Sequence, residues 1–274
     1  MSETLEHFFQ RLDAEQVRFE KKLPPKAAAH QLVDELFNLL FPVQCNDPKP
    51  ARLQYAILKH DLEQLLLPVS SNQDPAKVSE AFFRRLPAVH DALIEDAEAI
   101  LQFDPAATCL EEVIATYPGF QAISVYRIAH CLHQLQVPLL PRVFSEYVHG
   151  KTGIDIHPSA TIGRAFFIDH GTGVVIGATA VIGNNVKLYQ GVTLGALHVD
   201  KSLADIKRHP TIEDNCIIYA NSTILGGETV VGHSSVIGGN AWLTSSVQPY
   251  SIVLHQPQVK VRTKPFEEPI NFII

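Results

Sequence analysis

The feature that most constrains this chain is a six-residue period in its second half. From residue 154 onward an aliphatic residue recurs at every sixth position, and a small or polar residue commonly follows it. The periodic positions are Ile156, Ile162, Ile168, Ile176, Ile182, Leu188, Leu194, Ile212, Ile218, Ile224, Val231, Ile237 and Leu243. The phase slips by two residues before Ile176 and by one residue before Val231. Neither a helical turn of about 3.6 residues nor the alternation of a long strand accounts for this period.

A six-residue period is typical of a three-sided prism in which each short strand supplies one flat face. The aliphatic residue points into the prism. The small residue beside it lets the chain turn the corner, where glycine adopts unusual φ values at least cost. An ordinary β-sandwich would instead space its turns by about 8–12 residues. The period therefore predicts a parallel β-helix. Its left-handedness follows from what hexapeptide-repeat proteins are known to do and not from the spacing.

The first half of the chain has helical periodicity instead. One apolar face, at positions i, i+3, i+4 and i+7, is formed by Leu5, Phe8, Phe9 and Leu12. Two helix starts are also marked, because Asp74 and Asp104 each place a carboxylate at an N-cap position directly before a proline. These patterns predict an all-α N-terminal domain.

The whole chain is therefore predicted to have an α+β fold in three parts. Residues 1–150 form the α-helical domain, residues 151–262 the left-handed β-helix, and residues 263–274 a C-terminal tail. The repeat is interrupted once at length, between Leu194 and Ile212, so the β-helix is expected to carry one protruding loop. Loops on a rigid scaffold commonly carry function, and this loop is basic at its end.

Charge and composition exclude several classes of partner. The 274 residues carry a net charge of −7 and contain no long run of Lys or Arg, so nucleic acid and anionic membranes are not expected partners. The first residues are acidic where a signal peptide needs positive charge, and no apolar stretch approaches the length of a membrane span. The cysteines are scattered without a metal-like cluster, at Cys45, Cys109, Cys131 and Cys216. We therefore expect a cytoplasmic protein with free thiols and no metal.

Three blocks of sequence are specific enough to identify a family. Residues 154–160, 168–173 and 208–210 hold Asp-Ile-His-Pro, Asp-His-Gly-Thr-Gly and Arg-His-Pro segments within the hexapeptide context. In order and spacing they resemble bacterial and plant serine acetyltransferases, and the resemblance extends over about residues 104–250. It implies an acetyl-CoA-dependent O-acetyltransferase that acts on the hydroxyl of L-serine. The products are O-acetyl-L-serine and CoA, in the first step of cysteine biosynthesis.

The resemblance assigns the acid–base chemistry to His170. An alcohol that attacks a thioester needs a group to accept its proton, and histidine suits this task because its unperturbed pKa lies near neutrality. Asp155 precedes His170 by 15 residues, which places it one coil earlier in a repeat of about 18 residues. The resemblance implies that Asp155 fixes the imidazole tautomer. The alternatives are a His170 that only caps a coil and an Asp155 that is a solvated turn residue.

An amino-acid substrate presents an ammonium and a carboxylate, so the pocket needs both charges. The resemblance gives the carboxylate to Arg208, whose guanidinium offers a planar fork. It gives the ammonium to Asp104 and Asp169, and it assigns His209 to serine binding or to the tetrahedral oxyanion. Asp104 has an equal claim to an N-cap role before Pro105 and could fill both roles.

The same resemblance places acetyl-CoA in a groove between neighbouring β-helices and therefore implies a homotrimer. Whether two trimers pair into a hexamer is left open. The implied CoA contacts are the small residues Gly195, Ala196, Ala220 and Gly239. Small residues permit close backbone approach, although a hexapeptide repeat contains them in any case. Two departures from the family pattern lie near this groove. The loop before Arg208 is longer, and residues 255–258 replace the usual Gly-Val-Pro-Ala segment.

The last residue of the sequence, Ile274, points to a protein partner. In the family a terminal isoleucine inserts into the active site of O-acetylserine sulfhydrylase, so the resemblance implies that enzyme as a partner. The alternative is a tail that packs on its own subunit or stays disordered.

Three other functions compete with this interpretation. One is a related acyltransferase for another hydroxy amino acid, such as homoserine. The second is a γ-type carbonic anhydrase, which binds zinc through histidines that include a pair five residues apart. No histidine pair in the predicted β-helix has that spacing. The third is a non-catalytic scaffold, for which the polar residues around His170 would be superfluous.

Overall fold

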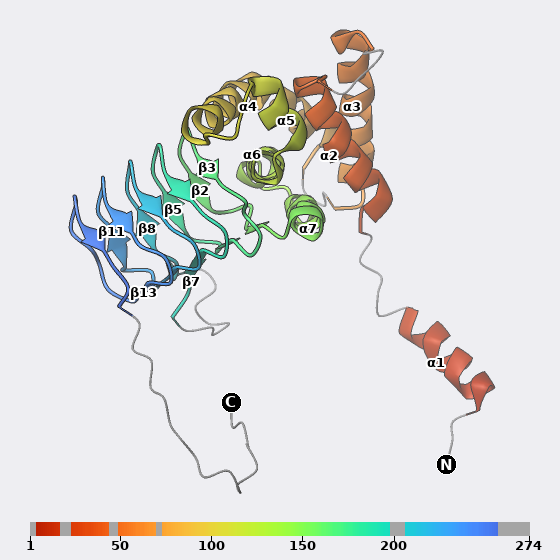
Figure 1. The fold of residues 1–274 in the computed structure, drawn as a ribbon. Coiled ribbons are helices and arrows are strands. Elements are labelled where there is room, and N and C mark those ends of the chain that lie inside the picture. Colours follow the sequence, from red (N-terminus) through yellow and green to blue (C-terminus); the bar gives the residue numbers. More distant parts are fainter. Residues whose placement is uncertain (1–3, 17–22, 44–48, 70–72, 198–205, 257–274) are drawn as a thin grey trace, which may run out of the picture.

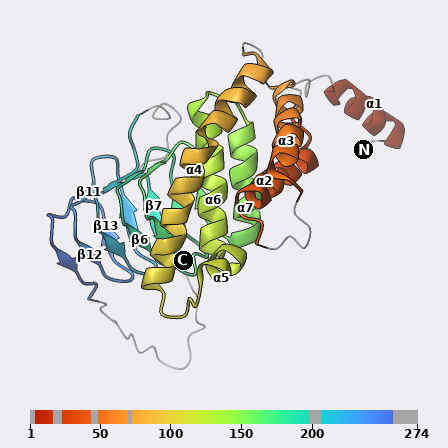
Figure 2. The same ribbon diagram turned by 90° about the horizontal axis from the view of Figure 1, so that it is seen from above.

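The structure is a computed structural model that describes residues 4–16, 23–43, 49–69, 73–197 and 206–256. Figure 1 shows helices in the first half of the chain and a triangular prism of short strands in the second half. Figure 2 shows the two halves packed side by side. The expected tail at 263–274, with Ile274, and the middle of the expected loop lie outside the described residues.

The predicted helical first half is confirmed. Its described helices are α1 (Leu5–Gln16), α2 (Lys26–Leu40), α3 (Ala51–Leu66), α4 (Pro75–Phe103), α5 (Leu110–Thr116), α6 (Pro118–Gln134) and α7 (Leu140–Thr152). Helix α1 stands apart from the rest of the molecule in Figure 1, and its apolar side chains Leu5 and Phe9 are exposed. Helices α2 to α7 all contribute to one apolar core, which includes Leu36, Leu62 and Phe120.

Only one of the two predicted helix starts is present. Asp74 is the N-cap of α4, and its carboxylate accepts a hydrogen bond from the Ala76 N–H group at 3.0 Å. Asp104 instead follows the last residue of α4, and its own N–H group donates to the Ile100 carbonyl at 2.9 Å. The chain then turns, and the next helix begins only at Leu110. The prediction that Asp104 begins a helix is therefore wrong, because α4 extends up to it and ends there.

The predicted left-handed β-helix is confirmed, with three parallel sheets as the faces of a prism. Its strands are β1 (Asp155–Ile156), β2 (Thr161–Ile162), β3 (Phe167–Ile168), β4 (Val175–Ile176), β5 (Val181–Ile182), β6 (Lys187–Leu188), β7 (Thr193–Gly195), β8 (Thr211–Ile212), β9 (Ile217–Ile218), β10 (Thr223–Leu225), β11 (Val230–Val231), β12 (Val236–Ile237), β13 (Trp242–Leu243) and β14 (Ile252–Val253). Sheet A has the order β1-β4-β7-β10-β13, sheet B has β2-β5-β8-β11, and sheet C has β3-β6-β9-β12-β14. Successive strands therefore pass from face to face around the prism.

The six-residue period correctly predicted which side chains fill the prism. Twelve of the thirteen periodic residues are buried, and each is the second residue of its strand. The exception, Leu243, is partly buried in β13. The two-residue slip before Ile176 corresponds to a wider turn between β3 and β4, in which His170 has a φ of 56°.

A buried ion pair fixes the helices to the first coil. Asp96 of α4 is fully buried, and its Oδ1 accepts a hydrogen bond from Nη2 of Arg127 in α6 at 2.7 Å. The same oxygen accepts the Phe166 N–H group at 2.8 Å, and Arg127 also donates to the Gly163 carbonyl at 2.7 Å. Because these groups come from two helices and from the first coil, this pair joins the two halves of the chain.

Candidate active site

The turn between β3 and β4 presents the predicted base. His170 has a left-handed backbone, and Gly171 and Gly173 follow with φ values of 82°. The positive φ favours glycine at position 171, and a Cβ atom there would also lie 2.4 Å from Ile154 Cδ1. In this turn the His170 side chain is 72% exposed to solvent. The imidazole is therefore accessible to a substrate and is not part of the core.

Asp169 lies beside this imidazole, with its Oδ1 atom 3.6 Å from His170 Nε2. Burial raises the pKa of Asp169, His170 lowers it, and the negative charge of Asp104 raises it again. The predicted hydrogen bond between Asp155 and His170 stays a prediction. Asp155 lies on β1 opposite Val175, and among the described residues no ion pair within 4.0 Å joins it to His170.

Asp104 approaches the same turn from the helical half. Its Oδ1 accepts the Ala106 N–H group at 2.8 Å, and its Oδ2 accepts the Tyr117 hydroxyl at 2.7 Å. Tyr117 was not among the predicted site residues. The available signal was its place in a Tyr-Pro-Gly segment shortly after Asp104, but spacing alone does not show where its hydroxyl points.

A close backbone approach holds the helical half against this turn. A Cβ atom at Gly119 would lie 2.2 Å from the Ile168 carbonyl oxygen. The start of α6 can therefore lie on the end of β3 only because residue 119 is glycine. This contact fixes the distance between the segment that carries Tyr117 and the turn that carries His170.

Arg208 and His209 lie at a different corner of the prism, directly before β8. The His209 imidazole fills the space beside Gly177, where a Cβ atom would lie 2.0 Å from His209 Cδ2. Thr179 Oγ1 accepts the N–H groups of Arg208 and His209 at 2.9 and 3.1 Å. The Lys207 ammonium donates to the carbonyls of Thr179 and His209 at 2.9 and 2.6 Å. The preceding coil therefore fixes the backbone of both predicted residues.

The hydrogen bonds at this corner assign the protonation state of His209. Its Nδ1 accepts the Thr179 N–H group at 3.1 Å, so the ring proton of the neutral imidazole is assigned to Nε2. Burial, together with the positive charges of Arg208 and Lys207, lowers the pKa of His209 to about 4. Near neutral pH the ring is therefore uncharged and donates through Nε2. This state suits a hydrogen-bond donor to substrate better than a general base.

The two corners differ in charge. The acidic corner joins sheets C and A and consists of Asp104, Asp169 and His170. The basic corner joins sheets A and B and consists of Arg142, His157, Arg208 and His209. At the basic corner, burial and the neighbouring positive charges, of which Arg142 is the largest, together lower the pKa of His157 to about 4. Because the corners lie at opposite edges of sheet A, one chain does not bring the two sets of predicted residues together.

The four predicted CoA contacts divide between the same corners. Gly195 and Ala196 lie at the end of β7, on the side of the basic corner. Ala220 and Gly239 follow β9 and β12, on the side of the acidic corner. A Cβ atom at Gly239 would lie 3.2 Å from the Ala220 carbonyl oxygen, so these two residues are neighbours in successive coils.

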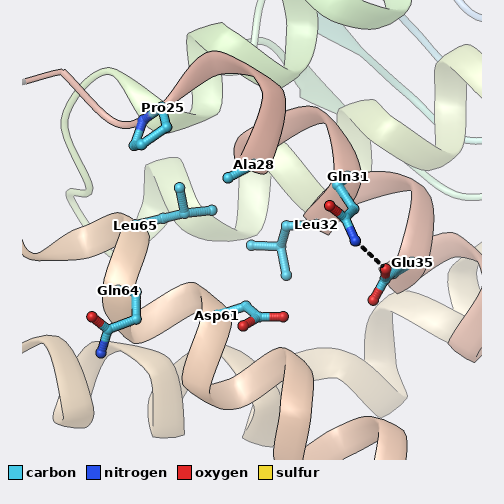
Figure 3. A pocket seen from close by; sticks show the side chains of 8 residues that line it. All are labelled: Pro25, Ala28, Gln31, Leu32, Glu35, Asp61, Gln64 and Leu65. Atoms are coloured by element: carbon cyan, nitrogen blue, oxygen red, sulfur yellow. Dashed lines mark hydrogen bonds between the residues drawn. The ribbon is translucent and has the colours of Figure 1, made fainter.

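A pocket in the helical half lies away from both corners. It has a volume of about 300 Å³ and lies between α2 and α3, as Figure 3 shows. Its lining residues are Pro25, Ala28, Gln31, Leu32, Glu35, Asp61, Gln64 and Leu65. On the α2 side of the pocket, Gln31 donates a hydrogen bond to Glu35 at 2.8 Å. No predicted site residue lines this pocket, so it does not mark the predicted site.

The described parts of the chain hold no group of three or more His, Cys, Asp or Glu side chains arranged to bind a metal ion. Within the same parts, no helix combines the length and the apolar character needed to cross a membrane. Cys109, Cys131 and Cys216 have free thiols, and Cys45 lies outside the described residues.

A helical half, a left-handed β-helix and polar groups at two of its corners define this chain as a hexapeptide-repeat protein. No protein-family model matches it. A plasmid-encoded serine acetyltransferase of Synechococcus elongatus is 48% identical over 205 residues, or 73% of this chain and 63% of the relative. The Bacillus subtilis serine acetyltransferase is 51% identical over 134 residues, or 49% of this chain and 60% of the relative. The match to these two relatives thus spans less than two thirds of their length.

Other relatives are matched over more of their length. The Helicobacter pylori serine acetyltransferase is 46% identical over 129 residues, which are 73% of that protein. The crystal structure of Entamoeba histolytica serine acetyltransferase 1 with L-cysteine has a TM-score of 0.75 and 36% identity, over 82% of this chain and 86% of that one. The Neisseria gonorrhoeae serine acetyltransferase in complex with serine has a TM-score of 0.60 and 26% identity, over 82% of this chain and 95% of that one. This chain therefore belongs to the serine acetyltransferase family.

Proposed function

We propose that this chain is a cytoplasmic serine O-acetyltransferase, which transfers acetyl from acetyl-CoA to the hydroxyl of L-serine. The observation that carries the proposal is the acidic corner. It presents an exposed imidazole beside two carboxylates, in a chain that is 48% identical to a serine acetyltransferase over 205 residues. An ammonium-bearing alcohol fits this arrangement, because the carboxylates can hold the ammonium while the imidazole accepts the hydroxyl proton.

In the proposed reaction His170 accepts the hydroxyl proton of serine as the serine oxygen bonds to the acetyl carbonyl carbon. The carbon–sulfur bond of the thioester then breaks, and His170 returns the proton to the CoA sulfur. Asp155 is proposed to orient the His170 ring, a role that rests on the resemblance. The neutral Nε2–H group of His209 is suited to donate to the serine or to the oxyanion of the tetrahedral intermediate.

We propose that a second copy of the chain completes the site. Asp104 and Asp169 would hold the serine ammonium, and Arg208 the serine carboxylate, yet Arg208 lies at the other corner of the prism. The opposite charges of the two corners favour contact between the acidic corner of one copy and the basic corner of the next. Such a head-to-tail contact closes into a ring, for which we propose a homotrimer.

The same contact forms the proposed acetyl-CoA groove. The predicted CoA residues lie along both corners, so copies that meet there would place them on the two walls of one groove: Gly195, Ala196, Ala220 and Gly239. Pairing of trimers into a hexamer and binding of O-acetylserine sulfhydrylase through Ile274 stay predictions.

The experiment that tests the function is the release of free CoA thiol from acetyl-CoA, with and without L-serine. We expect release that depends on L-serine and that is slower with L-homoserine or L-threonine at equal concentration. Faster release with homoserine would support the alternative acyltransferase instead. No release with any hydroxy amino acid would contradict the proposal.

Mixing two inactive variants tests whether each site is shared by two copies. His170→Asn and His209→Ala should each be nearly inactive alone. When they are unfolded together and refolded, some contacts pair an intact His170 corner with an intact His209 corner. About a quarter of the wild-type rate should return in an equal mixture, the statistical share of such contacts. A mixture no more active than its two components would show that one chain supplies the whole site.

Gly177→Ala tests the space that the structure reserves for the His209 ring. The new methyl group would lie 2.0 Å from His209 Cδ2, so the ring must move. A displacement of about 1 Å at a catalytic group can lower the rate by about 10²-fold, and we expect a loss of kcat/KM of that order. The matched control is Gly150→Ala in α7, where a Cβ atom would meet nothing within 4 Å. Equal rates for the two variants would contradict the assigned position of His209.

A further inference from the structure

Tyr117 and the Ala106 N–H group fix the Asp104 carboxylate from two sides. The Tyr117 hydroxyl donates to Oδ2 at 2.7 Å, and the Ala106 N–H group donates to Oδ1 at 2.8 Å. Each carboxylate oxygen can accept more than one hydrogen bond, so each keeps an acceptor site for a ligand. The plane of the carboxylate is therefore set before any ligand arrives.

The Tyr117 backbone is itself held in place. Tyr117 lies between α5 and α6, and its N–H group donates to the Val113 carbonyl at 3.2 Å. Its carbonyl accepts the Gln121 N–H group at 3.1 Å. Two residues later, Gly119 meets the Ile168 carbonyl at the end of β3. These contacts link the Tyr117 hydroxyl to the turn that carries His170 through rigid elements.

Charge makes the hydroxyl a fixed donor. The hydrogen bond to Asp104, together with burial, raises the pKa of Tyr117 to about 12. The negative charge of Asp104 also raises the pKa of Asp169, so the two carboxylates repel each other. The neutral Tyr117 hydroxyl withdraws part of the negative charge of Asp104 and so reduces this repulsion, while Asp104 stays available to a cation.

We propose that Tyr117 is a positioning residue that aims the Asp104 carboxylate at the ammonium of the amino-acid substrate. This inference rests on the proposed function, because it assigns Asp104 to that ammonium. Tyr117 acts through Asp104 and does not touch the reacting atoms. Its contribution therefore belongs to the binding of serine and not to the transfer of the acetyl group.

Tyr117→Phe is the test, since it removes only the hydroxyl oxygen. We expect KM for L-serine, and its dissociation constant measured by calorimetry, to rise by about tenfold, the scale of a hydrogen bond to a charged group. The value of kcat should stay within about twofold, and KM for acetyl-CoA should not change. The matched control is Tyr55→Phe in α3, whose exposed ring packs against Phe83 and which should behave as wild type.

A second comparison separates positioning from a general loss of structure. In an Asp104→Asn background, Tyr117→Phe should raise the L-serine dissociation constant by less than twofold, because the carboxylate that it positions is gone. A loss of the same size in both backgrounds, or a fall in kcat together with the thermal midpoint, would overturn the inference.

Failure of this inference can be told apart from failure of the proposed function. Serine-dependent CoA release by the wild type, with unchanged serine affinity in Tyr117→Phe, overturns the inference and leaves the function standing. Serine binding that depends on Tyr117 without CoA release contradicts the function and supports the inference. A wild type that neither binds nor acetylates L-serine contradicts both.

Discussion

His170→Asn is expected to lower kcat for the acetylation of L-serine by about 10²–10⁴-fold, the range that a general base contributes. Asparagine is the informative replacement because residue 170 has a φ of 56°, and asparagine tolerates this left-handed region better than alanine does. The turn that carries Asp169 should therefore persist. The main change is then the loss of the imidazole that we propose as the general base.

The measurement is kcat from CoA release, with the thermal midpoint as a check on folding. A matched control is His233→Asn. His233 follows β11 at the third corner of the prism, between sheets B and C, and its ring contacts Tyr250. That variant should keep the wild-type rate. A His170→Asn variant within about tenfold of the wild-type kcat would remove His170 from the mechanism.

Asp96→Asn is expected to destabilise the chain by about 3–5 kcal/mol, because it leaves the Arg127 guanidinium without its counter-charge in a buried position. The Arg127 side chain is only 10% exposed, so water cannot replace the lost carboxylate. The carboxylate also accepts the Phe166 N–H group. We therefore expect Asp96→Asn to destabilise the packing between the helices and the β-helix more than the internal packing of either half.

The control lies one residue away. Glu95 forms an ion pair with Arg164, and both partners are accessible to solvent. The Glu95 side chain is 40% exposed and the Arg164 side chain 54% exposed. Exposed pairs of this kind contribute at most about 1 kcal/mol, so Glu95→Gln should be nearly neutral. Urea unfolding is followed by far-ultraviolet circular dichroism for the helices and by the fluorescence of the single tryptophan, Trp242, for the β-helix. Equal losses for Asp96→Asn and Glu95→Gln would show that the buried pair has no special role.

The two probes also test whether the halves separate. In the wild type the helical and the tryptophan signals should change together, as expected for one cooperative unit. In Asp96→Asn the helical signal should change at a lower urea concentration than the Trp242 signal. If the two signals still changed together in Asp96→Asn, the Asp96–Arg127 pair would not be the contact that holds the two halves together.

The β-helix could be predicted closely because its pattern is local. A residue such as Ile182 or Ile218 needs only its place in the six-residue period to be assigned to the interior, and both are buried there. The helical half was less predictable, since long-range packing decides where helices end. Asp104 before a proline has the pattern of a helix start, yet α4 ends at it.

The sequence proposes candidate site residues but does not give their arrangement. The sequence places His170 and His209 in one repeat region, but only the path of the chain around the prism assigns them to different corners. Tyr117 was missed because its hydrogen bond to Asp104 depends on the path of the chain between residues 104 and 117. No periodic pattern in the sequence predicts that path. The tautomer of His209 depends on the Thr179 N–H group, 30 residues away in the chain.

In the proposed shared site, each contact between two copies forms one working site, so the number of sites equals the number of contacts. An open row of copies leaves an unmatched corner at each end, whereas a closed ring leaves none. We therefore expect dilution that separates the copies to lower the activity per chain.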